Sequence, residues 1–297
     1  MFGLRRRLGR EQGRHALVDG IPFATPVSAH RTPALIAGFP VDASRAGDLL
    51  PPGVRPLRVW RRGLLIVTVV DYRETVIGRY IEFSVAIACT RGDRPAPPLL
   101  PLLLRGPFKF GQYVYDLPVS TEISVKGGKG IWGMPKHRES LDFQVGERVV
   151  SSQYDLDGAP AVRIDIERPR MTWLPLRSSA ANYCEFRGML FKSVIGFRGR
   201  GGVTLFRPGA ATLQLGDQDR VKPLKELDIA PDPLFVGFFP DITGLLDDHV
   251  ESWFLTYDQP PSAAPEGLES VVDLGLSRAW PPPPRRDPAP DLEVRSG

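Results

Sequence analysis

The chain contains little lysine, cysteine or histidine. Only seven of its 38 basic residues are lysines, so arginine supplies nearly all of the positive charge. The two cysteines, Cys89 and Cys184, lie in apolar or aromatic surroundings far apart in the sequence, and the four histidines are equally scattered. Neither set has the close spacing of metal ligands. The sequence therefore predicts no metal site, and two buried free thiols of a reducing compartment.

Long apolar runs are also absent. The longest candidate, Leu99–Leu104, is interrupted by Pro101 and is far shorter than a membrane span. The arginine-rich N-terminus lacks the apolar segment of a secretory signal. We therefore expect a cytoplasmic protein without a membrane partner, with an organelle-targeting N-terminus as the second possibility.

Basic clusters on a folded surface are not expected either. The net charge is +4, but five arginines against Glu11 and Asp19 give the first twenty residues +3. A protein that binds nucleic acid needs concentrated charge on its folded part, so we expect no nucleic-acid partner. Residues 127–130 lack the spacing and the Ser or Thr of a phosphate loop, and Gly196–Gly202 lacks the dinucleotide fingerprint and is expected to be a hairpin loop. No cofactor is predicted.

Most of the middle of the chain has the pattern of β-strands. Leu64–Val70 is a nearly continuous β-branched run, and Tyr80–Cys89 alternates between an apolar face and a face with Glu82 and small side chains. Ser151–Glu167 predicts a hairpin that turns at Asp157-Gly158. Shorter strands are expected at Val203–Phe206 and Ala211–Leu215. Many strands with few helices predict a mainly β fold, an antiparallel barrel or folded sheet.

Two helices and two terminal extensions complete the predicted organisation. Asp42 is a candidate cap for a short helix, and Asp241–Leu255 has apolar residues at helical spacing. Nine prolines fall between Pro260 and Pro290, a composition that forms neither a ladder nor a core. We therefore divide the chain into a basic extension (residues 1–19), one domain (residues 20–257) and a proline-rich tail (residues 258–297).

The segment Gly128–His137 carries the most specific chemical signal. It reads Gly-Lys-Gly-Ile-Trp-Gly-Met-Pro-Lys-His, which places Lys136 directly after a rigid proline and close to Trp132 and Met134. Arginine stays protonated in proteins, whereas a buried lysine can lose its proton and become a nucleophile. Apolar neighbours that exclude water favour that neutral form. A solvated lysine in a surface turn is the alternative interpretation of these ten residues.

This segment resembles the motif of the acetoacetate decarboxylase family. In the family a Gly-Arg pair and a short apolar stretch precede Pro-Lys-Lys, whose first lysine forms a Schiff base with the substrate ketone. Gly128-Lys129 stands in place of Gly-Arg, Pro135-Lys136 is retained, and His137 replaces the second lysine. The resemblance extends weakly over residues 20–257. It implies that Lys136 is the catalytic lysine of a barrel of the acetoacetate decarboxylase-like type.

Two further residues match the family. Tyr80-Ile81-Glu82 resembles a Tyr-x-Glu segment whose glutamate lies beside the lysine, and Arg31 falls where the family has an arginine that faces the substrate carboxylate. The resemblance therefore implies catalysis by Lys136 and Glu82. The residues expected to bind substrate are Arg31, Trp132, Met134 and His137.

One acidic residue of the family pattern is missing. It would fall near Val67, among aliphatic residues, although Asp71 and Glu74 lie nearby. With the change at His137, this leaves the substrate open. The resemblance implies a homo-oligomeric enzyme that decarboxylates a small β-keto acid. The alternatives are a Schiff-base aldolase, dehydratase or cyclase acting on an oxo-acid, and a ligand-binding member without turnover.

Overall fold

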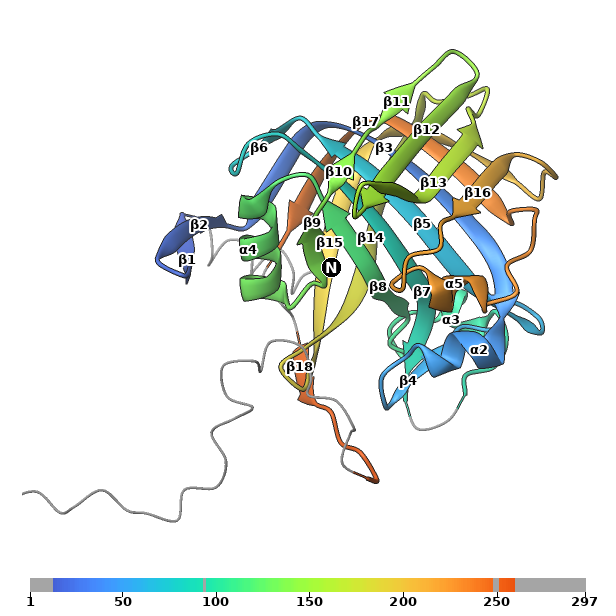
Figure 1. Ribbon diagram of the computed structural model, residues 1–297, viewed down its shortest axis with the longest axis horizontal. Coiled ribbons are helices and arrows are strands. Elements are labelled where there is room, and N and C mark those ends of the chain that lie inside the picture. Colours follow the sequence, from blue (N-terminus) through green and yellow to red (C-terminus); the bar gives the residue numbers. More distant parts are fainter. Residues whose placement is uncertain (1–12, 93–94, 248–250, 260–297) are drawn as a thin grey trace, which may run out of the picture.

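Seven strands close into a β-barrel (Figure 1). The computed structural model describes residues 13–92, 95–247 and 251–259. Around the barrel the order is β7-β5-β3-β17-β15-β14-β8, and β8 pairs again with β7. The strands are β3 (Val27–Asp42), β5 (Arg62–Tyr72), β7 (Tyr80–Arg91), β8 (Gly111–Val119), β14 (Leu174–Phe186), β15 (Met189–Leu205) and β17 (Phe235–Leu246).

This architecture confirms the predicted mainly β fold. Every neighbouring pair in the barrel is antiparallel except β8 and β14, which run parallel. The parallel pair was not predicted, because strand direction depends on the long connection between β8 and β14 and not on the sequence of either strand. It lies at the position where the helix α4 and the strand β9 leave the barrel wall (Figure 1).

A second sheet packs against the outside of the barrel. It contains the predicted hairpin, which turns at Asp157 (φ 52°) and Gly158 (φ 77°), two residues in the left-handed region as a tight hairpin turn requires. The largest core cluster fills the interface, with Phe83 and Ile87 of β7 packed beside Tyr154 and Ile164 of the second sheet. The sheet comprises β10 (Ser140–Leu141), β11 (Gln144–Val145), β12 (Val149–Leu156), β13 (Ala159–Glu167) and β16 (Ala211–Leu215).

The two faces predicted for Tyr80–Cys89 lie on opposite sides of the barrel wall. On β7, Phe83, Val85 and Ile87 point outward into the core beneath the second sheet. Glu82 and Ser84 point the other way and line the interior of the barrel. The polar face of this strand is thus the inner wall of the barrel and not a solvated edge.

Short elements surround the barrel. The hairpin of β1 (Arg14–Val18) and β2 (Ile21–Thr25) lies beside α4 (Figure 1), so the predicted division after residue 19 falls inside this hairpin. Most of the proline-rich segment from residue 258 lies outside the described residues. The other elements are β4 (Val54–Pro56), β6 (Glu74–Thr75), β9 (Lys136–Arg138), β18 (Glu251–Phe254), α2 (Ala43–Asp48), α3 (Leu100–Leu103), α4 (Glu122–Trp132) and α5 (Lys222–Lys225).

Two smaller predictions, the helix cap at Asp42 and the two buried thiols, are confirmed. Asp42 caps α2, because its carboxylate accepts hydrogen bonds from the backbone N–H groups of Ser44 and Arg45 at 2.9 Å. Cys89 and Cys184 are buried free thiols, and burial raises the pKa of Cys184 to about 12. No helix in the described ranges is long and apolar enough to cross a membrane.

The predicted helix over Asp241–Leu255 is wrong. Its first half belongs to β17 and its described second half contains β18, and both strands pair with β15. β17 also pairs with β3 on its other side. Two ladders of non-local hydrogen bonds outweigh the local helical spacing of the apolar residues.

The hairpin loop expected at Gly196–Gly202 is also wrong, because these residues lie within β15. Gly201 faces a close neighbour: a Cβ atom there would lie 2.0 Å from the ring of Phe239 on β17. The glycine therefore permits a close approach of two strands, and does not mark a turn.

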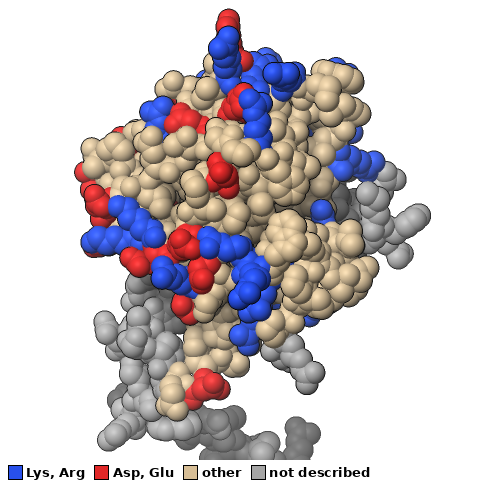
Figure 2. Space-filling model, turned by 90° about the vertical axis from the view of Figure 1, so that its right-hand side faces the viewer, with Lys and Arg blue, Asp and Glu red and all other residues tan. Residues whose placement is uncertain are grey.

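Charges of both signs are interspersed on the face shown in Figure 2. Ion pairs at the protein surface include Arg62 with Asp228, Lys222 with Asp219 and Lys225 with Asp217. On that face Lys and Arg gather in small groups with Asp and Glu beside them, in keeping with the net charge of +4.

Candidate active site

Helix α4 and the turn after it place Lys136 inside the protein. The helix ends at Gly133 in the left-handed region (φ 63°), and the N–H of Met134 bonds back to the carbonyl of Gly128 at 3.1 Å. The chain then enters β9, which pairs in parallel with β8. The lysine therefore faces the helix that immediately precedes it in the sequence.

The amine of Lys136 is held by two polar groups. Its Nζ lies 2.7 Å from a carboxylate oxygen of Glu82 and donates a hydrogen bond to Oγ of Ser124 at 3.0 Å. It also lies 5.4 Å from the centre of the Tyr80 ring. The residue is only 5% exposed. This burial overturns the interpretation of Lys136 as a solvated lysine in a surface turn.

Gly128 makes room for the lysine side chain. A Cβ atom at this position would lie 2.3 Å from Cδ of Lys136, far inside van der Waals contact. The methylene chain of the lysine therefore passes directly over the helix backbone. Glycine in the middle of α4 costs helix stability, and here it provides the space that the nucleophile occupies.

A cavity of about 60 Å³ lies at the amine. Four of the predicted site residues line this cavity: Lys136, its carboxylate partner Glu82, and the buried residues Trp132 and Met134. Trp132 is fixed by a hydrogen bond from its indole N–H to the carbonyl of Asp247 at 2.6 Å. Among the described lining residues, Lys136 is the sole lysine or arginine, so no second cation shares this wall.

Two tyrosines and a serine complete the site, and of these only Tyr80 was named from the sequence. Tyr72 and Tyr80 stack with ring centres 4.5 Å apart. Burial, and then the charge of Glu82, raise the pKa of both hydroxyls well above the ordinary value, so both remain neutral. Tyr72 could have been found, because it continues the inward positions of β5. Ser124 lies twelve residues before Lys136 on α4, and no sequence signal marks it.

His137 does not reach the cavity, although the sequence predicts it to bind substrate. Successive residues of a strand point to opposite sides, so His137 leaves β9 on the face away from Lys136. Its Nε2 lies 2.8 Å from Asp116 and its Nδ1 lies 2.9 Å from Glu139. Asp116 also accepts hydrogen bonds from Arg220 at 3.0 Å and from the hydroxyl of Tyr154 at 2.8 Å. We refer to these five residues as the Asp116 cluster.

The Asp116 cluster perturbs its own titrating groups. Burial by itself lowers the pKa of His137, but the hydrogen bonds and charge of Asp116 and Glu139 outweigh it and raise that pKa above its ordinary value. Burial likewise raises the pKa of Asp116, and His137 together with Arg220 reverses the effect, so that its pKa is lowered. Both shifts favour an ion pair between His137 and Asp116.

Arg31 is not brought to the cavity. Its side chain is 74% exposed and pairs with Glu74 at 2.9 Å. The residue has φ 50° in an irregular part of β3, where the register with β17 shifts. The acidic neighbours suggested as substitutes also lie elsewhere, since Asp71 pairs with Arg73 and Arg79 and Glu74 with Arg31.

A larger cavity of about 170 Å³ occupies the barrel interior, and we call it the lumen. It adjoins the lysine cavity, because Tyr72, Glu82 and Met134 line both, as do Asn182 and Ile195. The amide of Gln112 donates a hydrogen bond to that of Asn182 at 2.8 Å, so these two polar groups on the wall satisfy one another. Most other side chains around the lumen are apolar.

Known structures with this fold are distant in sequence. The enduracididine biosynthesis enzyme MppR with bound HEPES has a TM-score of 0.57 at 15% identity, over 78% of this chain and 88% of that chain. Acetoacetate decarboxylase from Legionella pneumophila has a TM-score of 0.55 at 13% identity, over 77% and 88%. MppR complexed with the condensation product of pyruvate and imidazole 4-carboxaldehyde has a TM-score of 0.55 at 14% identity, over 78% of this chain and 89% of that chain. These similarities show the fold.

Sequence comparison identifies the family. No curated protein is similar enough to this chain to count as a match. The model of the acetoacetate decarboxylase family, however, matches residues 13–172, more than half of the 297 residues. That range contains Glu82, Ser124 and Lys136, and the chain belongs to the acetoacetate decarboxylase family.

Proposed function

We propose that this protein is a Schiff-base enzyme that decarboxylates a β-keto acid. The observation that carries the proposal is the buried amine of Lys136, which lies between Glu82 and Ser124 at the wall of a small cavity. A lysine in such a place is available to a ketone and is screened from bulk water. Membership of the family supports the same chemistry.

The reaction begins with the transfer of a proton from the ammonium to Glu82, which lies 2.7 Å away. The neutral amine adds to the ketone carbon and water leaves, which forms a protonated imine. The bond between the α-carbon and the carboxylate then breaks, its electrons move toward the imine nitrogen, and carbon dioxide departs. Protonation of the enamine carbon and hydrolysis of the imine release the ketone and restore Lys136.

The neighbouring side chains have separate roles in this scheme. Ser124 accepts a hydrogen bond from the amine and fixes its direction toward the cavity. Tyr72, kept neutral by burial, donates a hydrogen bond to Glu82, and the hydroxyl of Tyr80 accepts hydrogen bonds from Tyr72 and Ser124. Trp132 and Met134 exclude water from the imine. Because Arg31 lies outside the lysine cavity, the scheme assigns it no contact with the carboxylate. The homo-oligomer and the cytoplasmic location remain predictions.

A second candidate is a Schiff-base aldolase or dehydratase. It is favoured by the similarity to MppR, whose structures include complexes with pyruvate and with a condensation product of pyruvate. In this reaction the imine loses a proton from its α-carbon to Glu82, and the resulting enamine attacks an aldehyde. Carbon dioxide is not released.

Gas release separates the two candidates. The purified protein is incubated with a panel of β-keto acids and, separately, with pyruvate and an aldehyde. We expect carbon dioxide and the matching ketone from at least one β-keto acid, and no gas above background from Lys136→Arg. Condensation with pyruvate in the absence of any gas release would move the assignment to the aldolase class.

A further inference from the structure

The inner wall of the barrel forms a graded path that begins at Lys136. Along β5 the inward residues follow in the order Tyr72, Val70, Thr68 and Ile66. Tyr72 lines both the lysine cavity and the lumen, and Val70 and Thr68 line the lumen. Ile66 lines a pocket of about 360 Å³ at the other end, which we call the outer pocket. Six residues of strand span about 20 Å, so the path leads through the barrel and away from the amine.

The middle of this path is mainly apolar. A cavity of 150 Å³ lined by aliphatic and aromatic side chains stays dry and binds benzene, and the lumen has about 170 Å³. It therefore has room for a group of about six carbons. The proposed chemistry at Lys136 needs much less space than this, and the lysine cavity of about 60 Å³ is filled by a few atoms.

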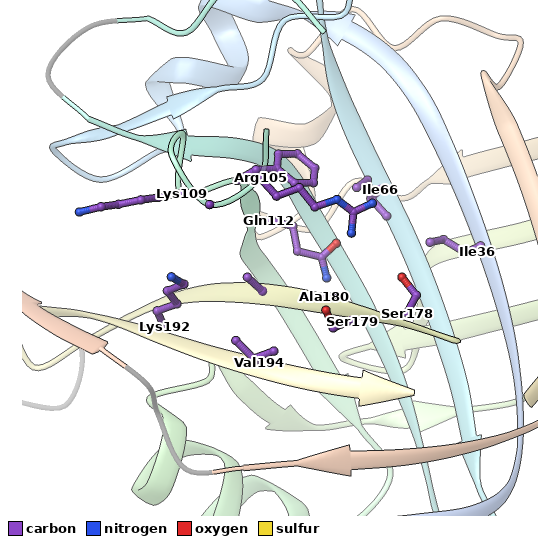
Figure 3. Close-up of a pocket in the computed structure, with 14 residues that line it drawn as sticks. Ile36, Ile66, Arg105, Lys109, Gln112, Ser178, Ser179, Ala180, Lys192 and Val194 are labelled. Carbon is purple, nitrogen blue, oxygen red and sulfur yellow. The ribbon is translucent and has the colours of Figure 1, made fainter. Parts of the chain in front are cut away.

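The far end of the path becomes polar and basic. Ile36, Gln112 and Ala180 line both the lumen and the outer pocket. Arg105, Lys109 and Lys192 line the outer pocket. Figure 3 shows the guanidinium of Arg105 directed toward Ile66, whereas the side chain of Lys109 points away from the other labelled residues. The apolar stretch is therefore bounded by Glu82 and Lys136 at one end and by cations at the other. A bound apolar group is limited to the length of the lumen.

We propose that the lumen binds an apolar substituent of about six carbons on the substrate ketone. This rests on the proposed function and assigns its substrate class: oxo-acids or ketones in which one arm of the carbonyl is an unbranched alkyl or aromatic group. With the carbonyl carbon at Lys136 Nζ, this arm enters the lumen past Tyr72 and Met134, which line both cavities. The other arm, which bears the carboxylate, stays in the lysine cavity.

A chain-length series tests this proposal. Imine formation is measured by borohydride trapping with methyl ketones from propanone to 2-octanone, as the concentration that gives half-maximal trapping. Each methylene buried in the lumen should lower that concentration about fourfold, the equivalent of about 0.8 kcal/mol. Equal or weaker trapping of the longer ketones would overturn the proposal. Trapping of no ketone at all would instead remove the proposed function.

Substitutions in the lumen sharpen the test. Thr68→Phe fills the lumen without touching the lysine cavity, so it should abolish the advantage of 2-octanone and leave propanone within about twofold of the wild type. Thr212→Phe, at an exposed position of β16, is the matched control and should leave the series unchanged. If Thr68→Phe does not fold, Ala180→Leu fills the same space from β14. An unchanged preference for 2-octanone in a folded lumen variant would contradict the assignment.

Discussion

The two faces of β9 have opposite character. On one face Lys136 meets a single carboxylate in a small cavity whose walls are mostly apolar. On the other face the next residue, His137, joins a dense set of charges around Asp116. A lone amine beside open space is suited to react, whereas a histidine whose two ring nitrogens are both occupied is suited to hold its strand in place. The family motif brings the two residues together in sequence, and the strand separates their roles.

The largest effect that tests this comparison is expected at Glu82. Glu82→Gln removes the group that accepts the proton of Lys136, and general acid–base groups typically contribute 10²- to 10⁴-fold. We therefore expect kcat to fall by about that factor in folded protein. Borohydride should still trap an imine on Lys136, because the nucleophile remains. A kcat within threefold of the wild type would assign proton transfer to another group.

Asp116→Asn tests the opposite face. It leaves His137 and Arg220 without their buried carboxylate, and removing one member of a buried ion pair typically costs 3–5 kcal/mol. Because Arg220 is half exposed, we expect the free energy of unfolding, measured by chemical denaturation, to fall by about 3 kcal/mol. Turnover per folded molecule should change less than threefold. A large loss of kcat with unchanged stability would mean that the Asp116 cluster takes part in the chemistry.

The pH dependence of stability distinguishes the faces in another way. The pKa of His137 is raised in the folded protein. Its contribution to folding stability is therefore complete below the unfolded-state pKa of about 6.5 and is lost as the pH rises through the folded-state pKa. The pKa of Asp116 is lowered, so its contribution is complete above about 3.8 and is lost as the pH falls through the folded value. Both contributions to stability are therefore fully present between about pH 4 and 6.5.

His137→Gln isolates the first of these contributions. The substitution should cost about 1.5–3 kcal/mol at pH 6, as expected for hydrogen bonds to charged groups, and less at pH 9. Denaturant titrations at the two pH values measure the difference. A cost that does not depend on pH would show that the histidine is held as a neutral ring.

The smallest effect is expected at Arg31. Its guanidinium is exposed and paired with Glu74, and exposed ion pairs contribute about 0–1 kcal/mol. Arg31→Ala should therefore change stability by less than about 1 kcal/mol and kcat/KM by less than threefold. A loss of 30-fold or more in kcat/KM would restore the role in carboxylate binding that the sequence predicts.

The sequence predicts the parts of the site that depend on local spacing. Alternation along Tyr80–Cys89 separates Glu82 from the core residues of β7, and the motif at Pro135 identifies Lys136. Both predictions depend only on residues within one strand or turn. The structure adds that the two side chains meet, because β7 and β9 are neighbours of the same strand, β8.

The rest depends on contacts between distant segments. Ser124 reaches Lys136 because α4 packs along β9. The glycines that permit this packing have low helix propensity, so the sequence alone does not indicate a helix here. The register shift in β3 that turns Arg31 outward has no local signature. The side on which His137 faces Asp116 is likewise set by the pairing of β9 with β8. Family motifs therefore identify the residue types of this site more reliably than they orient the side chains.

Borohydride trapping followed by peptide mapping tests whether Lys136 is the nucleophile. The protein is reduced in the presence of a panel of ketones and oxo-acids, and the modified peptide is found by mass spectrometry among those that carry the seven lysines. Lys136→Arg is the matched control, because it keeps the charge but cannot form an imine. We expect one adduct, at Lys136, that is lost in the variant. An adduct at another lysine, or none with any compound of the panel, would contradict it.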